Sequence, residues 1–195
     1  MNVVGIYGSP RKGGNSDLIL DSALEGARQQ GADVKRIYVR DLHMSGCVEC
    51  GGCEKTGTCV VQDDMKDVYP LLDDADIIIV SSPIFFYGLS SQVKALIDRA
   101  QAIWSRKRLQ QRGGERQGTR GRGYLLAVAA TRGEKLFQGA QMVAKYFFDA
   151  LSMGFGGELS FHGLEEKGAV RHHPDALRKA YDLGMNVARA DKTYP

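Results

Sequence analysis

The sequence predicts an α/β fold, a single doubly wound domain with five parallel strands in the order 2-1-3-4-5 and helices on both faces of the sheet. Short apolar runs, typical of strands buried on both faces, alternate along the chain with segments of helical periodicity. The run Ile77-Ile78-Ile79-Val80 is the clearest of these strands. Such alternation indicates right-handed crossovers and one parallel sheet. The 195 residues are enough for one full domain and too few for two.

The expected elements follow from these runs and from local start and stop signals. Strands are expected at 3–8, 34–39, 76–81, 124–129 and 158–161. Helices are expected at 15–30, 63–72, 90–104, 138–151 and 174–189. Gly31 ends the first helix, and Asp63 or Asp64 caps the second. The charged side chains of Lys35 and Arg36 interrupt the second strand, which indicates a strand at the edge of the sheet.

The segment 8–16, Gly-Ser-Pro-Arg-Lys-Gly-Gly-Asn-Ser, connects the first strand to the first helix. The N–H groups of such a turn and of the helix N-terminus favour negative charge. Arg11 and Lys12 add positive charge, and Asn15 or Ser16 can cap the helix while offering a polar group to a phosphate. A turn that only connects strand and helix is the alternative, but it does not need two cations beside three glycines.

Two common phosphate motifs do not match this segment. A P-loop would need Lys after Gly13, and a dinucleotide fingerprint would need Gly in place of Pro10. What remains is a loop suited to one compact phosphate monoester, such as the phosphate of FMN. The predicted phosphate-binding residues are Ser9, Arg11, Lys12, Gly13, Asn15 and Ser16.

Two further loops are expected at the same sheet edge, where ligands of such folds bind at the switch between the first and third strands. The loop 82–88 carries three consecutive aromatic residues. We expect them to pack along a flavin ring or to lie at a subunit contact that covers the ring. The alternative is that they belong to the core. The loop 130–134 offers backbone N–H groups and an arginine to the charge of a reduced flavin. The predicted cofactor-binding residues are Pro83, Ile84, Phe85, Phe86, Tyr87 and Gly88 in the first of these loops, and Thr131, Arg132 and Gly133 in the second.

All four cysteines lie in a cysteine-rich loop at 44–60, after the second strand. Cys47, Cys50, Cys53 and Cys59 form the pattern C-x2-C-x2-C-x5-C. Three thiolates at this spacing can converge on one cuboidal cluster that the fourth closes, so we expect them to bind a 4Fe–4S cluster. Zinc, which prefers two separated C-x2-C pairs, and an unmetallated thiol–disulfide pair are the alternatives. The loop is expected on the same sheet edge as the phosphate loop.

Together the two motifs resemble a known family. The segment 8–16 after an N-terminal strand is similar to the FMN-phosphate loop of the flavodoxin-like NAD(P)H-dependent FMN reductases, and the compact cysteine motif is similar to that of their iron–sulfur flavoprotein branch. The resemblance implies a flavodoxin-like fold, FMN held by the three loops, and a 4Fe–4S cluster that exchanges electrons with FMN. It also implies ferredoxin or NAD(P)H as electron donor, a small-molecule oxidant, and a homodimer or homotetramer. An NAD(P)H-dependent FMN or quinone reductase with unmetallated cysteines is the alternative, and a zinc-stabilised nucleotide-sensing module is a further one.

The segment 105–123 holds seven lysines and arginines against one glutamate. It predicts a basic flexible insertion, or else a docking patch for an acidic electron carrier or for the phosphates of NADPH. A net charge of +3 without a recognition motif gives little support to nucleic acid binding. No apolar run approaches the ~20 residues of a membrane span, and no signal peptide precedes the first strand, so a cytoplasmic location is expected. His172 and His173 are expected to cap the last helix or lie at the surface.

Overall fold

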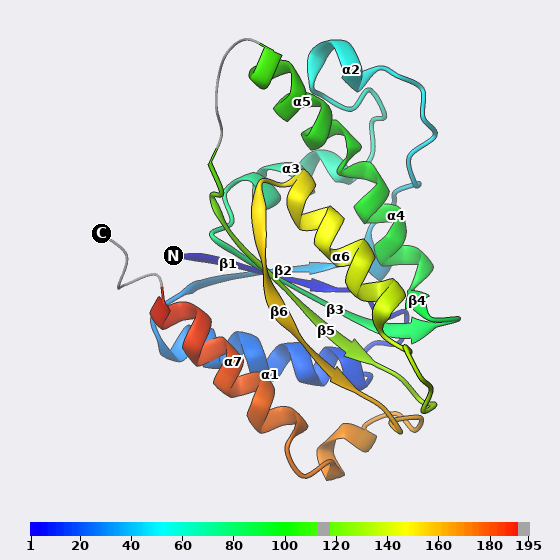
Figure 1. The fold of residues 1–195 in the computed structure, drawn as a ribbon, viewed down its shortest axis with the longest axis vertical. Coiled ribbons are helices and arrows are strands. Elements are labelled where there is room, and N and C mark those ends of the chain that lie inside the picture. Colours follow the sequence, from blue (N-terminus) through cyan, green and yellow to red (C-terminus); the bar gives the residue numbers. More distant parts are fainter. Residues whose placement is uncertain (113–117, 191–195) are drawn as a thin grey trace.

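The computed structural model describes residues 1–112 and 118–190, which form a parallel sheet between two layers of helices (Figure 1). The strands are β1 (Asn2–Tyr7), β2 (Asp33–Tyr38), β3 (Ile77–Phe85), β4 (Gly88–Leu89), β5 (Gly121–Val128) and β6 (Met153–Phe161). The helices are α1 (Asn15–Gln29), α2 (Cys53–Thr56), α3 (Met65–Asp73), α4 (Ser91–Arg99), α5 (Gln101–Arg112), α6 (Gln138–Ala150) and α7 (Ala176–Ala190), with 3-10 turns η1 (Val39–Asp41) and η2 (Ala169–His172). Among the described residues, no helix has the length and apolar character to cross a membrane.

Within the described residues the strand order is β2-β1-β3-β5-β6, all in parallel, and the short β4 pairs antiparallel with the end of β3. With β4 set aside, this is the order 2-1-3-4-5 that the sequence predicts, and β2 lies at an edge as expected. The central strand β3 is buried on both faces. Its Ile78 and Val80 pack in the core beneath α3 to α6, while Ile77 and Ile79 pack in the core beneath α1 and α7.

The first and last helices lie side by side on one face of the sheet (Figure 1). Glycines bring their backbones into contact, because a Cβ atom at Gly184 of α7 would overlap the carbonyl oxygen of Ala23 in α1. A Cβ atom at Gly26 would likewise overlap the carbonyl oxygen of Tyr181. This close approach joins the two ends of the chain into a single layer.

Two expected boundaries in the middle of the chain are wrong, and the last strand, expected at 158–161, begins at Met153. The strand expected at 76–81 continues to Phe85 and turns back as β4, so a hairpin replaces the loop expected at 82–88. The helix expected at 90–104 is interrupted at Ala100, whose N–H bonds to Ile97 O (3.0 Å) in a tight last turn of α4. A second helix, α5, then continues to Arg112.

The basic segment is therefore not a flexible insertion over most of its length. Residues 105–112 lie in α5 and residues 121–123 in β5, while 113–117 lie outside the described residues. Basic side chains find partners from distant elements: Arg106 pairs with Asp73 of α3 (2.5 Å), and Lys107 donates to Asp149 O of α6 (2.9 Å). The guanidinium of Arg120 donates to carbonyl oxygens at the ends of α3 and α6, including Leu72 O (2.6 Å) and Leu151 O (2.8 Å).

Local caps differ in part from expectation. The N-cap of α1 is Gly14, so the expectation that Asn15 or Ser16 caps this helix is wrong. Asp63 supports the start of α3, because its Oδ1 accepts a hydrogen bond from Met65 N (3.1 Å). His173 supports the start of α7 as expected, with Nδ1 accepting from Ala176 N (3.1 Å). The cysteine-rich loop expected at 44–60 contains the short helix α2 and is preceded by η1.

Gly184→Ala is expected to lower the free energy of unfolding by about 1–3 kcal/mol, because the new methyl group must push α7 away from the Ala23 carbonyl. This loss should appear even though alanine is the better helix former by about 1 kcal/mol. Urea denaturation followed by circular dichroism measures the change. Gly154→Ala is the control, since a Cβ atom there meets no neighbour closer than 3.6 Å. Equal stability of the two variants would contradict the close helix contact.

Candidate functional site

The phosphate loop, residues 8–16, lies at the switch point of the sheet between β1 and β3. Gly8 N donates to Ser81 O (2.7 Å), and Gly8 O accepts a hydrogen bond from the buried hydroxyl of Ser90 (2.5 Å). The hydroxyl of Ser81 donates to Ser16 O in the first turn of α1 (2.8 Å). These bonds fix both ends of the loop to the carboxyl end of β3 and to the start of α4.

Hydrogen bonds within the loop give it a defined shape. Ser9 Oγ accepts a hydrogen bond from Arg11 N (3.2 Å), and Gly14 N donates to Arg11 O (3.1 Å). Gly13 has a φ of +67°, a left-handed conformation that favours glycine. In the described part of the chain no side chain caps α1, so its first N–H groups are available to an anion. Arg11 and Lys12 are exposed beside them.

A buried ion pair supports the loop from η1. Arg40 Nη1 lies 3.0 Å from Asp17 Oδ2, and the two side chains are 10% and 6% exposed. Arg40 also donates to Ser9 O (3.2 Å), and Asp17 accepts a hydrogen bond from Gly13 N (2.9 Å). Burial raises the pKa of Asp17 from its usual value, and Arg40 and the Gly13 N–H group oppose this shift. The pair therefore links the end of β2 to both sides of the phosphate loop.

A fourth loop, residues 162–170 after β6, closes the site and was not expected from the sequence. Asn15 Nδ2 donates to Leu164 O (3.2 Å) and Glu166 O (2.8 Å), and Asn15 Oδ1 accepts from Val170 N (3.2 Å). Asn15 therefore holds this loop in place, and both donors of its side-chain amide are used within the protein. Lys167 lies above the phosphate loop, with Cε 3.9 Å from a Cβ atom built on Gly13.

The aromatic hairpin, residues 85–87, is exposed at the same sheet edge. Phe85, Phe86 and Tyr87 are 49%, 103% and 51% exposed, so the alternative that they belong to the core is wrong. Phe86 and Tyr87 have φ values of +49° and +63°, which is unfavourable for residues with a side chain. The preceding Pro83 and Ile84 are half-buried within β3, and Gly88 begins β4.

The loop 130–134 contacts the aromatic hairpin, and the sequence predicts that both loops lie at the same edge of the sheet. A Cβ atom at Gly133 would lie 2.6 Å from the hydroxyl of Tyr87. Thr131 and Arg132 are exposed, and the Arg132 side chain also reaches the fourth loop, with Nε 3.8 Å from a Cβ atom built on Gly163. The hairpin, the loop 130–134 and the fourth loop therefore form neighbouring parts of one edge beside the phosphate loop.

The cysteine loop is fastened at its base by Arg99, the last residue of α4. The guanidinium donates to Ser45 O (3.0 Å) and to both carboxylate oxygens of Asp63 (2.6 and 3.0 Å), and its side chain is 1% exposed. Tyr69 of α3 donates to Arg99 O (3.0 Å), and burial raises the pKa of Tyr69 to about 12. Arg99 thus joins the two ends of the loop to α4 and α3.

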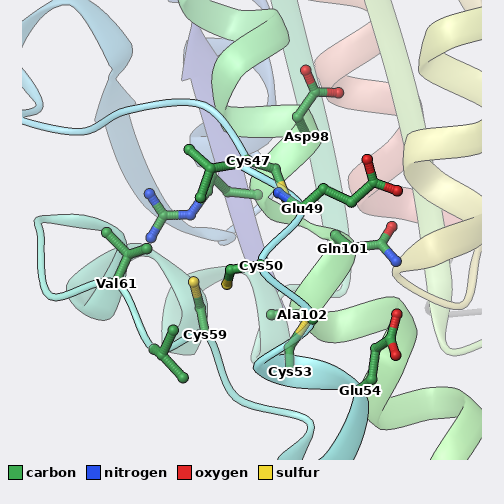
Figure 2. Close-up of a pocket in the computed structure, with 14 residues that line it drawn as sticks. Cys47, Glu49, Cys50, Cys53, Glu54, Cys59, Val61, Asp98, Gln101 and Ala102 are labelled. Atoms are coloured by element: carbon green, nitrogen blue, oxygen red, sulfur yellow. The ribbon is translucent and has the colours of Figure 1, made fainter.

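The four predicted cysteines line one cavity of about 300 Å³ between the loop and the junction of α4 with α5 (Figure 2). All four are free thiols: Cys47 and Cys50 are exposed, and Cys53 and Cys59 are partly buried. Arg99 lines the same cavity, and its Nε is buried without a hydrogen-bond partner among the described residues.

The cavity does not lie at the sheet edge where the sequence placed it. The loop leaves the carboxyl end of β2 as expected but then runs along α4, with Gly46 against Ala95 and the thiols near Arg99. The phosphate loop contacts Ser90 at the other end of α4, and the helix of nine residues is about 14 Å long. The expected position on one common edge is therefore wrong, and α4 separates the two sites.

The donor set bears on which group the cysteines can hold. A zinc ion needs its ligands around one point, and in residues 1–112 and 118–190 no three His, Cys, Asp or Glu side chains are arranged to hold a metal ion. A 4Fe–4S cluster takes its thiolates on different iron atoms, so its four sulfur ligands surround a larger volume. Four thiols around one cavity, with a buried N–H group of Arg99 beside them, fit such a cluster.

Similarity to known proteins identifies the family of this chain. A family model described as NADPH-dependent FMN reductase matches residues 1–163. The chain belongs to this family. The match includes the phosphate loop, the cysteine loop, the aromatic hairpin and the loop 130–134, and it confirms the family that the two motifs resemble. The relatives below support the branch that the cysteine motif resembles.

The curated relatives include an iron–sulfur flavoprotein of Archaeoglobus fulgidus, 37% identical over 99 residues, which are 51% of this chain and 45% of the relative. An iron–sulfur flavoprotein of Methanosarcina thermophila is 38% identical over 100 residues, 51% of this chain and 52% of the relative. The chain thus spans about half the length of the curated relatives it matches.

Solved structures agree on the fold. A flavone reductase has a TM-score of 0.68 at 19% identity, covering 99% of this chain and 64% of its own. A flavodoxin from the Archaea has a TM-score of 0.59 at 16% identity, covering 98% and 99%. These likenesses confirm the flavodoxin-like fold.

Asp63→Asn is expected to lower the free energy of unfolding by about 3–5 kcal/mol at neutral pH, because Arg99 is then buried without its counter-charge. Hydrogen bonds from Arg99 hold the pKa of Asp63 below its usual value. The stabilisation is therefore complete above the unfolded-state pKa of about 3.9 and is lost as pH falls through the lower folded-state pKa.

Denaturation of wild type and variant between pH 7 and pH 2.5 measures this difference. The control is Asp98→Asn, which breaks the exposed pair with Lys94 and should cost less than about 1 kcal/mol. A loss in Asp63→Asn no larger than in the control, or one that does not shrink in acid, would contradict the role of the Arg99 pair.

Proposed function

We propose that this protein is an FMN-binding oxidoreductase in which the phosphate loop 8–16 holds the phosphate of the flavin. The observation that carries the proposal is the uncapped start of α1 beside exposed Arg11 and Lys12, at the switch point of the sheet, in a chain of the NADPH-dependent FMN reductase family. A phosphate monoester needs N–H donors and compensating positive charge, and this loop offers both. Lys167 supplies a further cation from the fourth loop.

The flavin ring would lie beside the aromatic hairpin and the loop 130–134. When bound, FMN supplies the redox chemistry, since it takes up two electrons and releases them together or singly. The exposed aromatic side chains of Phe85, Phe86 and Tyr87 would cover apolar ring surface and exclude water from it. Arg132 and the N–H groups of this loop would stabilise negative charge on the reduced ring.

The cysteine cavity would hold a 4Fe–4S cluster, with Cys47, Cys50, Cys53 and Cys59 as ligands. When bound, such a cluster accepts and donates single electrons. Support comes from the four thiols around one cavity and from the name iron–sulfur flavoprotein that several relatives carry. Because α4 separates the two sites within one chain, a second subunit that brings its own cavity near the flavin is part of the proposal, as a homodimer or homotetramer.

The partners in this proposal are NAD(P)H or ferredoxin as electron donor and a small-molecule oxidant, in the cytoplasm. Arg106 is paired with Asp73, so a docking patch would rely on other basic residues of α5. Arg108 stacks on Trp104 with its guanidinium carbon 4.6 Å from the ring centre, and Arg112 is exposed one turn further on. These two cations lie beside the cysteine loop, where an acidic carrier would exchange electrons with a cluster.

Ser9→Ala combined with Arg11→Ala is expected to weaken FMN binding about a hundredfold, because two groups that shape and charge the phosphate loop are lost. Titration of the apoprotein with FMN, followed by quenching of flavin fluorescence, measures the dissociation constant. Lys35→Ala removes an exposed cation of β2 away from the loop and serves as the control. Undiminished FMN affinity in the double variant would show that the phosphate lies elsewhere.

Cys53→Ala is expected to abolish stable iron binding, because a cluster deprived of one of four thiolates is lost readily. Iron analysis and absorbance of anaerobically purified protein test this, with about four iron atoms per chain expected for wild type. Ser45→Ala, a change in the same loop that keeps the carbonyl bound by Arg99, should retain the iron.

Three results would count against the cluster. Full iron content in Cys53→Ala would exclude this ligand set. A yellow wild-type protein without iron would favour the NAD(P)H-dependent FMN or quinone reductase with unmetallated cysteines. Stoichiometric zinc without flavin absorbance would favour a zinc-stabilised module.

A further inference from the structure

A buried hydroxyl lies against one of the four thiols. Ser105 of α5 is 3% exposed, and its Oγ lies 3.5 Å from Cys53 Sγ, within hydrogen-bonding reach of the large sulfur atom. Ser105 and Ala102, which lines the cysteine cavity, are one turn apart on α5. In Figure 2 the Cys53 side chain lies beside Ala102, so this face of α5 forms the wall behind the thiol.

The backbone conformation of α2 places Cys53 against this face of α5. Cys53 is the first residue of α2, and Gly57 ends the helix with a φ of +70°, its N–H group donating to Cys53 O (2.8 Å). A Cβ atom at Gly57 would lie 2.7 Å from Cβ of Arg106, the residue after Ser105. The lack of a side chain at Gly57 thus permits the close approach of α2 to α5.

The four thiols differ in their access to other donors. Cys47 and Cys50 are exposed, so water can bond to their sulfur atoms, whereas Cys53 is partly buried against α5. A cysteine bound to iron is a thiolate, which only accepts hydrogen bonds. In a loaded site the hydroxyl of Ser105 must therefore be the donor of this pair.

We propose that the Ser105 hydroxyl donates a hydrogen bond to the Cys53 thiolate and thereby raises the reduction potential of the cluster. This inference rests on the proposed 4Fe–4S cluster. Reduction adds negative charge to the cluster and its sulfur ligands, and a hydrogen-bond donor stabilises the more negative state. Ser105 is thus a positioning residue, which acts through a ligand and does not bind iron itself.

The test compares wild type, Ser105→Ala and Ser105→Thr, purified without oxygen. The midpoint potential of the cluster is followed by electron paramagnetic resonance during redox titration, alongside iron and FMN content and the rate of iron release to a chelator. Ser105→Ala should keep its iron and FMN and shift the one-electron equilibrium about tenfold toward the oxidised cluster, which equals about 59 mV. Ser105→Thr keeps the hydroxyl and should restore the wild-type potential.

Ser91→Ala, an exposed serine at the start of α4, is the matched control and should leave the potential unchanged. A loaded Ser105→Ala protein with an unchanged potential, or a control that shifts equally, would overturn this inference and leave the proposed function intact. A wild-type protein without iron would overturn this inference together with the proposed cluster, and would leave the proposed FMN site to its own test.

Discussion

The buried guanidinium of Arg99 is the interaction on which the cysteine half of this molecule depends. It binds Ser45 O and the Asp63 carboxylate, which lie at the two ends of a loop with little regular structure of its own. Isolated burial of such a charge would be unfavourable, and the carboxylate compensates it. The same bonds that neutralise Arg99 also close the loop, so the position of the thiols follows from the position of one arginine.

The helix that carries Arg99 organises the other site as well. Ser90, which precedes α4 and caps it through Val93 N (3.4 Å), also bonds to Gly8 O of the phosphate loop. One short helix therefore contacts the phosphate loop at its start and the cysteine loop at its end. This helix of nine residues, about 14 Å long, fixes the separation between the two loops that it contacts.

The sequence predicts the frame of the fold well, because the signals for the frame are local. The run at Ile77 to Val80 identifies the central strand, the charges of Lys35 and Arg36 identify the edge, and Gly31 ends α1. The phosphate loop can be predicted from the sequence for the same reason, since one stretch of chain supplies the turn, the cations and the start of the helix. The proposed cysteine ligand set rests on spacing alone, and the structure brings its four members to one cavity.

The features that sequence reasoning missed depend on distant partners. Asn15 bonds to residues about 150 positions later, and nothing near it in the sequence indicates this. The helix through 105–112 is stabilised by Asp73 and the carbonyl of Asp149, which local composition cannot show. Arg99 is one of several charged residues in its helix, and neither its burial nor its partner at position 63 could be identified from periodicity.

The bonds of Asn15 also bear on the order of events during synthesis. The wall that Asn15 holds is made by residues 164–170, far from Asn15 in the sequence. A ribosome delivers the phosphate loop about 150 residues before this wall. The nascent chain therefore cannot complete its anion pocket until residues 164–170 have been made, which delays capture of a small-molecule ligand until long after the phosphate loop itself has left the ribosome.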